Sequence, residues 1–140
     1  MRALIDTCVI IDVLQSRQPY SAAAEKLFLF AANQMFTGCI TAKSSTDIYY
    51  LTHRLTNDDK SARIILGKLF SLFEVVDTAG TDCRRAIPSD VSDYEDAVMI
   101  ETALRTEVDC IVTRNLRDYK KSPVPVYTPE QMIKKLEEEQ

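Results

Sequence analysis

Four aspartates stand where their carboxylates can meet in the folded chain. Asp6 directly follows a short apolar run, and Asp118 follows a later apolar run by a short loop. Asp47 and Asp96 lie on segments with helical patterns. Carboxylates that converge from separate segments repel one another, so a fold keeps such a cluster chiefly when a divalent cation neutralises it. Because oxygen ligands favour hard ions, the pattern predicts a site for Mg²⁺ or Mn²⁺.

Taken singly, these carboxylates also have structural explanations. Asp6 can cap a helix that begins near Cys8, Asp96 can interact with the dipole of its helix, and Asp118 can start a turn. The occurrence of four of them in separate segments favours the metal site. A zinc site built on nitrogen ligands is excluded, because His53 is the only histidine.

The elements that must position these residues alternate between strands and helices. Strands are predicted at residues 3–5, 35–40, 74–76, 110–112 and 124–127. Helices are predicted at residues 21–33 and 57–73, around residues 48–55, and in a shorter segment that ends near residue 88. This alternation predicts an α/β three-layer sandwich, with a five-stranded parallel sheet covered by helices.

Two helix starts carry the spacing of a capping box. They are Ser92 with Glu95, and Thr128 with Gln131, the second with Pro129 at the first helical position. In an open parallel sheet, ligands bind outside the carboxyl ends of the strands. Residues that follow the predicted strands are therefore the first candidates for function.

Length and composition indicate one domain, spanning residues 1–140. The chain has 140 residues, of which 46% are hydrophobic and 27% charged, which is ordinary for a globular protein. Seventeen basic and 21 acidic residues give a net charge of -4, so any contact with nucleic acid must be local.

The cysteines and the hydropathy pattern point to a cytoplasmic protein. None of the four cysteines forms a C-x-x-C pair, which excludes a zinc ribbon and a thioredoxin motif and favours reduced thiols. Acidic residues interrupt the N-terminus, so no signal peptide is predicted. The longest apolar run, residues 27–32, is too short to span a membrane.

In the segments around the four aspartates, the sequence resembles the PIN domain nucleases. The resemblance is carried, in order, by Leu4-Ile5-Asp6-Thr7 with Asp12 following, Ser45-Thr46-Asp47-Ile48-Tyr49-Tyr50-Leu51, Asp93-Tyr94-Glu95-Asp96-Ala97, and Ile111-Val112-Thr113-Arg114-Asn115-Leu116-Arg117-Asp118-Tyr119. It implies a five-stranded parallel sheet, an acidic pocket that uses Mg²⁺ or Mn²⁺, and cleavage of single-stranded RNA. Many small relatives are VapC-type toxins held by an antitoxin, and the resemblance also implies a homodimer.

The resemblance assigns roles to the acidic residues. Asp6 and Asp96 match the central metal ligands, and Asp47 matches the second acidic position, where many relatives have the longer Glu. Asn115 stands where many relatives have Asp. Its carbonyl oxygen can coordinate, and Asp118 is the alternative source of the missing charge and a third candidate metal ligand.

Five further residues are predicted to support the metal ligands. Thr7 and Thr113 match small hydroxyl residues that line such pockets, although either can simply satisfy backbone groups. Glu95 is expected to cap Ser92 and Asp93 to interact with the helix dipole, either as structural residues or as a second shell around the metal. Asn115 completes this group.

Substrate phosphates need cations near the site. The predicted RNA-binding residues are Lys43, Arg54, Arg114 and Arg117, and Lys120 and Lys121 follow them in sequence. As solvated helix and loop charges these side chains also need no such role. Tyrosines 49, 50 and 119 can stack on bases or pack in the core.

Other functional classes are less consistent with the sequence. A haloacid-dehalogenase phosphatase needs D-x-D, but position 8 is Cys8, and a phosphoaspartate receiver needs an acidic pair where only Asp6 stands. Glycine-rich phosphate-binding motifs are absent from the sequence. The remaining alternative is a catalytically weak or inactive PIN-like module that binds RNA or a protein partner, a hypothesis supported by Asn115 and the short Asp47.

Overall fold

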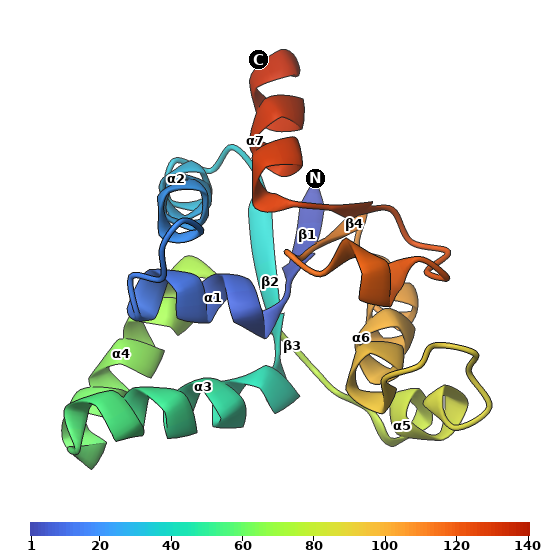
Figure 1. Cartoon of the computed structure of the whole chain (residues 1–140), viewed down its shortest axis with the longest axis horizontal. Helices are drawn as coiled ribbons and strands as arrows, with labels where there is room; N and C mark the ends of the chain where they lie inside the picture. Colours follow the sequence, from blue (N-terminus) through green and yellow to red (C-terminus); the bar gives the residue numbers. More distant parts are fainter.

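A parallel β-sheet forms the centre of the protein in the computed structural model, which describes all residues from Met1 to Gln140 (Figure 1). Its five strands are β1 (Arg2–Ile5), β2 (Thr37–Thr41), β3 (Glu74–Val76), β4 (Cys110–Val112) and β5 (Val126–Tyr127). The helices are α1 (Thr7–Leu14), α2 (Ser21–Ala32), α3 (Ala42–Thr56), α4 (Asp59–Leu72), α5 (Gly80–Ala86), α6 (Tyr94–Arg105), the 3-10 helix η1 (Leu116–Tyr119) and α7 (Pro129–Glu138). The predicted sandwich with a five-stranded parallel sheet is thereby confirmed.

The order of the strands places a crevice at the centre of the sheet. That order is β3-β2-β1-β4-β5, and every neighbouring pair is parallel. The chain runs outward from β1 through β2 to β3, and then crosses to the other side of β1 for β4 and β5. At such a reversal the connections after two adjacent strands leave in opposite directions and open a crevice at the carboxyl ends. Asp6 lies there, and its N–H donates to the Val112 carbonyl at 2.9 Å.

Two separate cores cover the two faces of the sheet. Ala3 and Ile5 point into one core, which is shared with helices α1 to α4 and α7, whereas Leu4 points into the other, which is shared with α6 and η1. This alternation follows from the two-residue repeat of a strand. Figure 1 shows α1 to α4 on one side of the sheet and α5 and α6 on the other. Residues that follow β1 therefore lie between helices of both layers.

Two predicted strands are longer than the observed ones. Strand β2 begins at Thr37 rather than at Met35, and β5 covers only Val126–Tyr127 rather than 124–127. Pro125 has no N–H to donate, although its carbonyl accepts from Ile111 N at 2.9 Å. Strand β5 therefore begins at Val126, directly after the proline.

One of the two predicted capping boxes is confirmed. Thr128 Oγ1 accepts from Gln131 N at 3.1 Å, and Gln131 Oε1 accepts from Thr128 N at 2.9 Å. The assignment of Ser92 as the other cap is wrong, because Asp93 caps α6 by accepting from Asp96 N at 3.2 Å. An aspartate caps as well as a serine, so the helix starts one residue later.

Two further observations concern the cysteines and the length of the apolar helices. All four cysteines are free, and Cys39 and Cys110 are buried. None of the helices combines the length and the apolar character that crossing a membrane requires.

The close packing of Gly38 in β2 generates a prediction about stability. A Cβ at this position would lie 2.5 Å from Phe73 Cδ1, and the Phe73 ring is buried edge-on against Phe28. We expect Gly38→Ala to lower the free energy of unfolding by about 1–3 kcal/mol in a urea titration, as overpacking does. Gly67 in α4 is the matched control, because a Cβ there meets nothing within 4 Å. Gly67→Ala should raise the free energy of unfolding by about 0.5–1 kcal/mol. A Gly38→Ala protein as stable as Gly67→Ala would contradict this account.

Candidate active site

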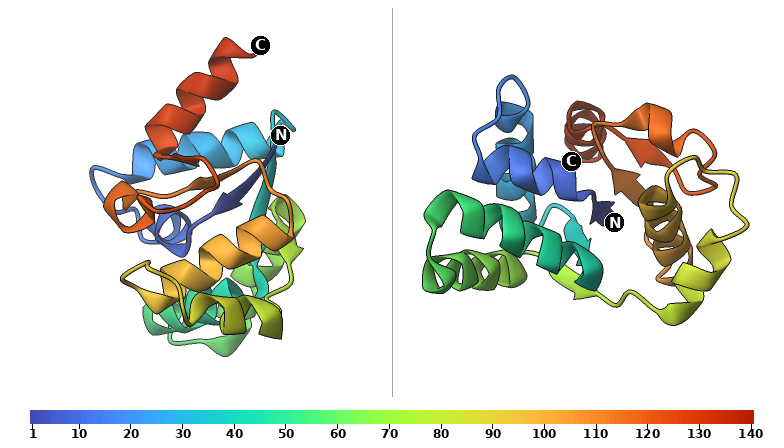
Figure 2. Two further views of the ribbon diagram at one scale, coloured as in Figure 1. Left: turned by 90° about the vertical axis from the view of Figure 1, so that its right-hand side faces the viewer. Right: turned by 60° about the horizontal axis from the view of Figure 1, so that its bottom comes forward.

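A cleft of about 680 Å³ opens at the carboxyl edge of the sheet, beside the end of β1. Asp6 and Thr7 line it at the end of β1, Asp47 on α3, and Glu95 and Asp96 on α6. Figure 2 shows α3 and α6, the helices that provide its two walls, on opposite sides of the β1 strand end. The cleft thus collects polar side chains from both helical layers.

Two of the predicted metal ligands meet at a tyrosine. The Tyr119 hydroxyl donates toward Asp96 Oδ1 at 3.2 Å and toward Asp6 Oδ2 at 3.4 Å. The ring of Tyr119 is buried in the core beside α6. Burial, together with the charges of Asp6 and Asp96, raises the pKa of Tyr119, so the hydroxyl keeps the proton that it donates. From the sequence, Tyr119 was predicted only to stack on a base or to pack in the core, and its contact with both carboxylates was not predicted.

A second hydroxyl orients Asp6. Thr113, directly after β4, donates from Oγ1 to Asp6 Oδ2 at 2.8 Å. The same Oγ1 accepts from the backbone N–H of Asn115 at 3.1 Å, so the Thr113 proton is directed at Asp6. Thr113 therefore supports the carboxylate. The Asn115 side chain is exposed and is not among the residues that line the cleft.

Thr7 connects the end of β1 to the start of α3. Its hydroxyl donates to Ser44 Oγ at 3.0 Å, and Ser44 Oγ lies 2.8 Å from Thr41 Oγ1. Thr41 caps α3 by accepting from Ser44 N at 3.1 Å. This chain of hydroxyl groups fixes the first turn of α3, which carries Lys43 and is followed in the next turn by Asp47. Neither Thr41 nor Ser44 was predicted from the sequence to lie beside the site.

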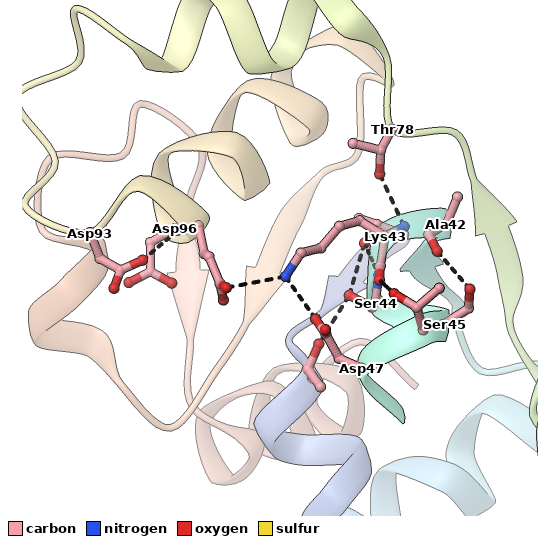
Figure 3. A network of polar contacts seen from close by, with 12 residues as sticks. Ala42, Lys43, Ser44, Ser45, Asp47, Thr78, Asp93 and Asp96 are labelled. Carbon is pink, nitrogen blue, oxygen red and sulfur yellow. Dashed lines mark hydrogen bonds and ion pairs between the residues drawn. The ribbon is translucent and has the colours of Figure 1, made fainter. Parts of the chain in front are cut away.

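Lys43 forms a bridge across the mouth of the cleft. Its ammonium lies 2.7 Å from Asp47 Oδ2 on α3 and 3.4 Å from Glu95 Oε1 on α6 (Figure 3). Burial lowers the pKa of Lys43, but the hydrogen bond and charge of Asp47, with those of Glu95, outweigh this effect, and the net pKa is raised. Glu95 is at the second position of α6 and does not cap Ser92, so its predicted capping role is wrong.

Negative charge accumulates around Asp96. Burial, together with the charges of Asp93, Asp6 and Asp118, raises the pKa of Asp96 to about 6 against the opposing hydrogen bond from Tyr119. Neither Asp96 nor Asp6 takes part in any of the eight ion pairs of the structure, so their ionised forms have no positive partner. A bound cation would supply that partner.

The donor set fits a hard divalent cation that retains several waters. No group of three or more His, Cys, Asp or Glu side chains is placed to hold a metal ion. Asp6 and Asp96 nevertheless face the same hydroxyl, and Mg²⁺ is commonly held by one or two carboxylates with water filling the other positions. Asp118, on η1, is exposed and outside the lining of the cleft, while Asp47 is paired with Lys43.

Comparisons with known proteins identify the family. The family model described as PIN domain matches residues 2–117. The chain belongs to the PIN domain family. This membership confirms the resemblance that the four acidic segments carry.

Solved structures share the fold of this PIN domain. VapBC2 from Rickettsia felis, bound to a DNA fragment from its promoter, has a TM-score of 0.64 at 15% identity, covering 91% of this chain and 98% of that one. A toxin-antitoxin complex from Klebsiella pneumoniae gives 0.66 at 20% identity, covering 91% and 97%. VapBC-1 from nontypeable Haemophilus influenzae gives 0.68 at 11% identity, covering 93% and 99%. A comparison with curated protein sequences finds no match.

The four predicted RNA-binding residues occupy different environments in this PIN domain. Lys43 and Arg54 line the cleft, whereas Arg114 and Arg117 do not. Arg114 pairs with buried Asp12 through Nε at 2.6 Å and Nη2 at 3.1 Å. Its guanidinium also lies 4.1 Å from the centre of the Tyr20 ring. Arg114 is thus engaged inside the fold, and Arg117 is exposed on η1.

The raised pKa of Asp96 generates a prediction about pH and metal. Because the folded-state pKa of about 6 exceeds the ordinary value of 3.8, the folded state binds the proton more tightly than the unfolded state. The contribution of Asp96 to the free energy of unfolding should therefore fall as pH rises from about 4 to about 6. Asp96→Asn removes this titration, so without metal its melting temperature should exceed that of the wild type above pH 6 and approach it near pH 4. Differential scanning fluorimetry in EDTA measures the difference.

Addition of Mn²⁺ provides the second half of this test. Binding to the folded state raises the melting temperature, so the wild type should be stabilised and Asp96→Asn should respond much less. Asp109→Asn is a matched control, because Asp109 lies before β4, at the opposite edge of the sheet, and accepts from Arg2 N. A metal response that is equal in all three proteins would show that Asp96 does not hold the ion.

Proposed function

We propose that this PIN domain is an endoribonuclease that hydrolyses phosphodiester bonds of single-stranded RNA with the help of Mg²⁺ or Mn²⁺. The observation that carries the proposal is the pair of Asp6 and Asp96, which meet at the Tyr119 hydroxyl in the cleft and take part in no ion pair. Membership of the PIN domain family supports the same chemistry. The site lies where the strand order reverses, as ligand sites in such sheets do.

In this proposal each residue around the cleft has a defined task. Asp6 and Asp96 would hold the cation, with Asp118 on η1 or Asn115 directly before η1 as the proposed further contributor. Thr113 keeps Asp6 oriented, and the Tyr119 hydroxyl keeps the two carboxylates close to each other. A bound divalent cation supplies a water of lowered pKa and neutralises charge that develops on the phosphate oxygens.

Asp47, at the second acidic position, and the basic side chains of Lys43 and Arg54 would act on the substrate. Asp47 lies in the cleft, and its ion pair with Lys43 places an ammonium at the mouth. Lys43 can exchange its carboxylate partners for a phosphate oxygen, because such exposed pairs contribute only about 0–1 kcal/mol. Arg54 lies further along the same wall. Thr7, Asp93 and Glu95 would support these groups through the contacts of the first turns of α3 and α6.

The proposed partners are an antitoxin protein and a second copy of the chain, in the cytoplasm. The similar structures from Klebsiella pneumoniae and Rickettsia felis are described as a toxin-antitoxin complex and as VapBC2. For a homodimer, Leu29 of α2, whose side chain is 63% exposed, is a candidate interface residue. Light scattering at micromolar concentration would give the mass of a dimer, and a monomer would exclude it.

A second candidate function is binding without cleavage. The observations in its favour are the ion pair that occupies Asp47, the exposed Asn115 at the fourth acidic position, and the absence of a group of three acidic ligands. Under this hypothesis the protein binds RNA or a protein partner, and the carboxylates contribute little to catalysis.

Cleavage of labelled single-stranded RNA distinguishes the two candidates. We expect cutting with Mn²⁺ and none with EDTA. Asp6→Asn and Asp96→Asn should each reduce the rate by about a hundredfold or more, because even residues that only support metal ligands affect activity by 10–100-fold. Asp109→Asn, at the other edge of the sheet, should cut like the wild type. Cutting that survives in both site variants would come from a contaminant, and a folded wild type that binds metal and RNA without cutting would favour the binding module.

A further inference from the structure

An exposed aromatic side chain stands in the cleft on α3. Tyr50 is 69% exposed, although its ring lines the same cleft as the carboxylates. An exposed aromatic ring forgoes most of the hydrophobic stabilisation that burial would give it. The four helical neighbours of Tyr50 are Thr46, Asp47, His53 and Arg54, none of them aliphatic. Tyr50 is therefore not part of a continuous apolar patch on this helix.

The ring of Tyr49 supports Tyr50 from one side. Tyr49 packs edge-on against it, with ring centres 5.7 Å apart and planes inclined by 72°. Tyr49 also stacks on His53, and its hydroxyl donates to the Asp59 carboxylate at the start of α4. The Tyr50 ring thus rests on an ordered support that is anchored in the next helix. Such order in the free protein lowers the entropy cost of binding a ligand.

An acidic group, an aromatic ring and a cation follow one another along α3. This order suits a nucleotide chain, in which bases and phosphates alternate. Lys43, Asp47, Tyr50 and Arg54 follow one another on the face that lines the cleft. With a rise of about 1.5 Å per residue, Tyr50 lies about 4.5 Å beyond Asp47 along the helix axis, and Arg54 lies about 6 Å beyond Tyr50. Arg54 takes part in none of the eight ion pairs of the structure. An aromatic ring thus lies between the acidic site and an available cation.

The opposite wall supplies a second ring. Tyr94, the first residue of α6, lines the cleft and is 48% exposed. Its hydroxyl donates to the Cys83 carbonyl at 3.1 Å, which fixes the end of the side chain on α5. Both helical walls of the cleft therefore carry an exposed, ordered tyrosine.

We propose that Tyr50 is the stacking platform of a nucleobase subsite, which holds one unpaired base of a single-stranded RNA beside the carboxylates while Arg54 contacts an adjoining phosphate. This inference rests on the proposed function and adds the element that selects unpaired RNA. A base within a duplex is stacked on both faces and cannot lie on Tyr50. Stacking also supplies affinity that the overall charge of -4 does not, because the protein as a whole repels phosphates.

Binding measurements with and without bases test the subsite. The Asp6→Asn background prevents cleavage, and fluorescence anisotropy reports binding to a short labelled oligoribonucleotide and to an abasic oligomer of the same length. Adding Tyr50→Leu should weaken binding to the base-bearing oligomer by about tenfold, as loss of one stacked base does, and leave the abasic oligomer unaffected. Tyr50→Phe keeps the ring and should retain the affinity. Phe70→Leu removes a ring that is 44% exposed on α4, outside the cleft, and should change neither affinity.

Each other outcome overturns the subsite. If Tyr50→Leu weakens binding to both oligomers equally, the ring maintains the cleft and does not stack on a base. If Tyr50→Leu binds both oligomers like its background and the wild type still cuts RNA, the nuclease stands without the subsite, and this surface is left for a protein partner. If the wild type neither binds nor cuts RNA, the proposed function falls together with the subsite.

Discussion

Repulsion between Asp6 and Asp96 is the constraint to which the surrounding elements respond. Both carboxylates lie within 3.4 Å of the one hydroxyl of Tyr119, and burial keeps water from screening them fully. The Tyr119 ring is buried between α6 and the sheet, so its hydroxyl is placed by packing and not by the carboxylates. Thr113 adds a second donor to Asp6. Tyr119 is thus the one donor that lies against both acids, while Thr113 fixes Asp6 alone, and both donors are placed by the packing around them.

A buried ion pair stabilises the loop that carries these donors. Asp12 of α1 is fully buried and binds Arg114, which directly follows Thr113. Leaving a buried charge unpaired costs about 3–5 kcal/mol, so Asp12 strongly favours the conformation in which Arg114 returns to α1. That return sets the path of the chain from β4 into η1 and hence the position of Tyr119. The same geometry explains why Arg114, predicted on the RNA-facing rim, lies outside the cleft.

Local patterns predicted most of the fold and part of the site. Alternating apolar runs located every strand, and the order of the acidic segments brought Asp6 and Asp96 to one place. Contacts between distant residues were not predictable, because Tyr119 lies 113 positions from Asp6 and reaches it only through the packing of η1. The predicted start of α6 was wrong by one residue, and this error changed the role assigned to Glu95. With Asp93 instead of Ser92 as the cap, Glu95 no longer caps the helix and is free to meet Lys43.

The width of the cleft and the charge inside it have separate origins. Its walls belong to different layers, because α3 packs with α1 and α4 on one face of the sheet and α6 packs with α5 on the other (Figure 1). The sheet between them therefore sets their separation, while the bridge from Lys43 to Asp47 and Glu95 contributes little, since all three side chains are at least 41% exposed. A cation or phosphate that enters can replace this bridge at small cost without moving a wall. The proposed hydrolysis of a phosphodiester would use this combination, because such a site must keep its shape while its ionic partners change.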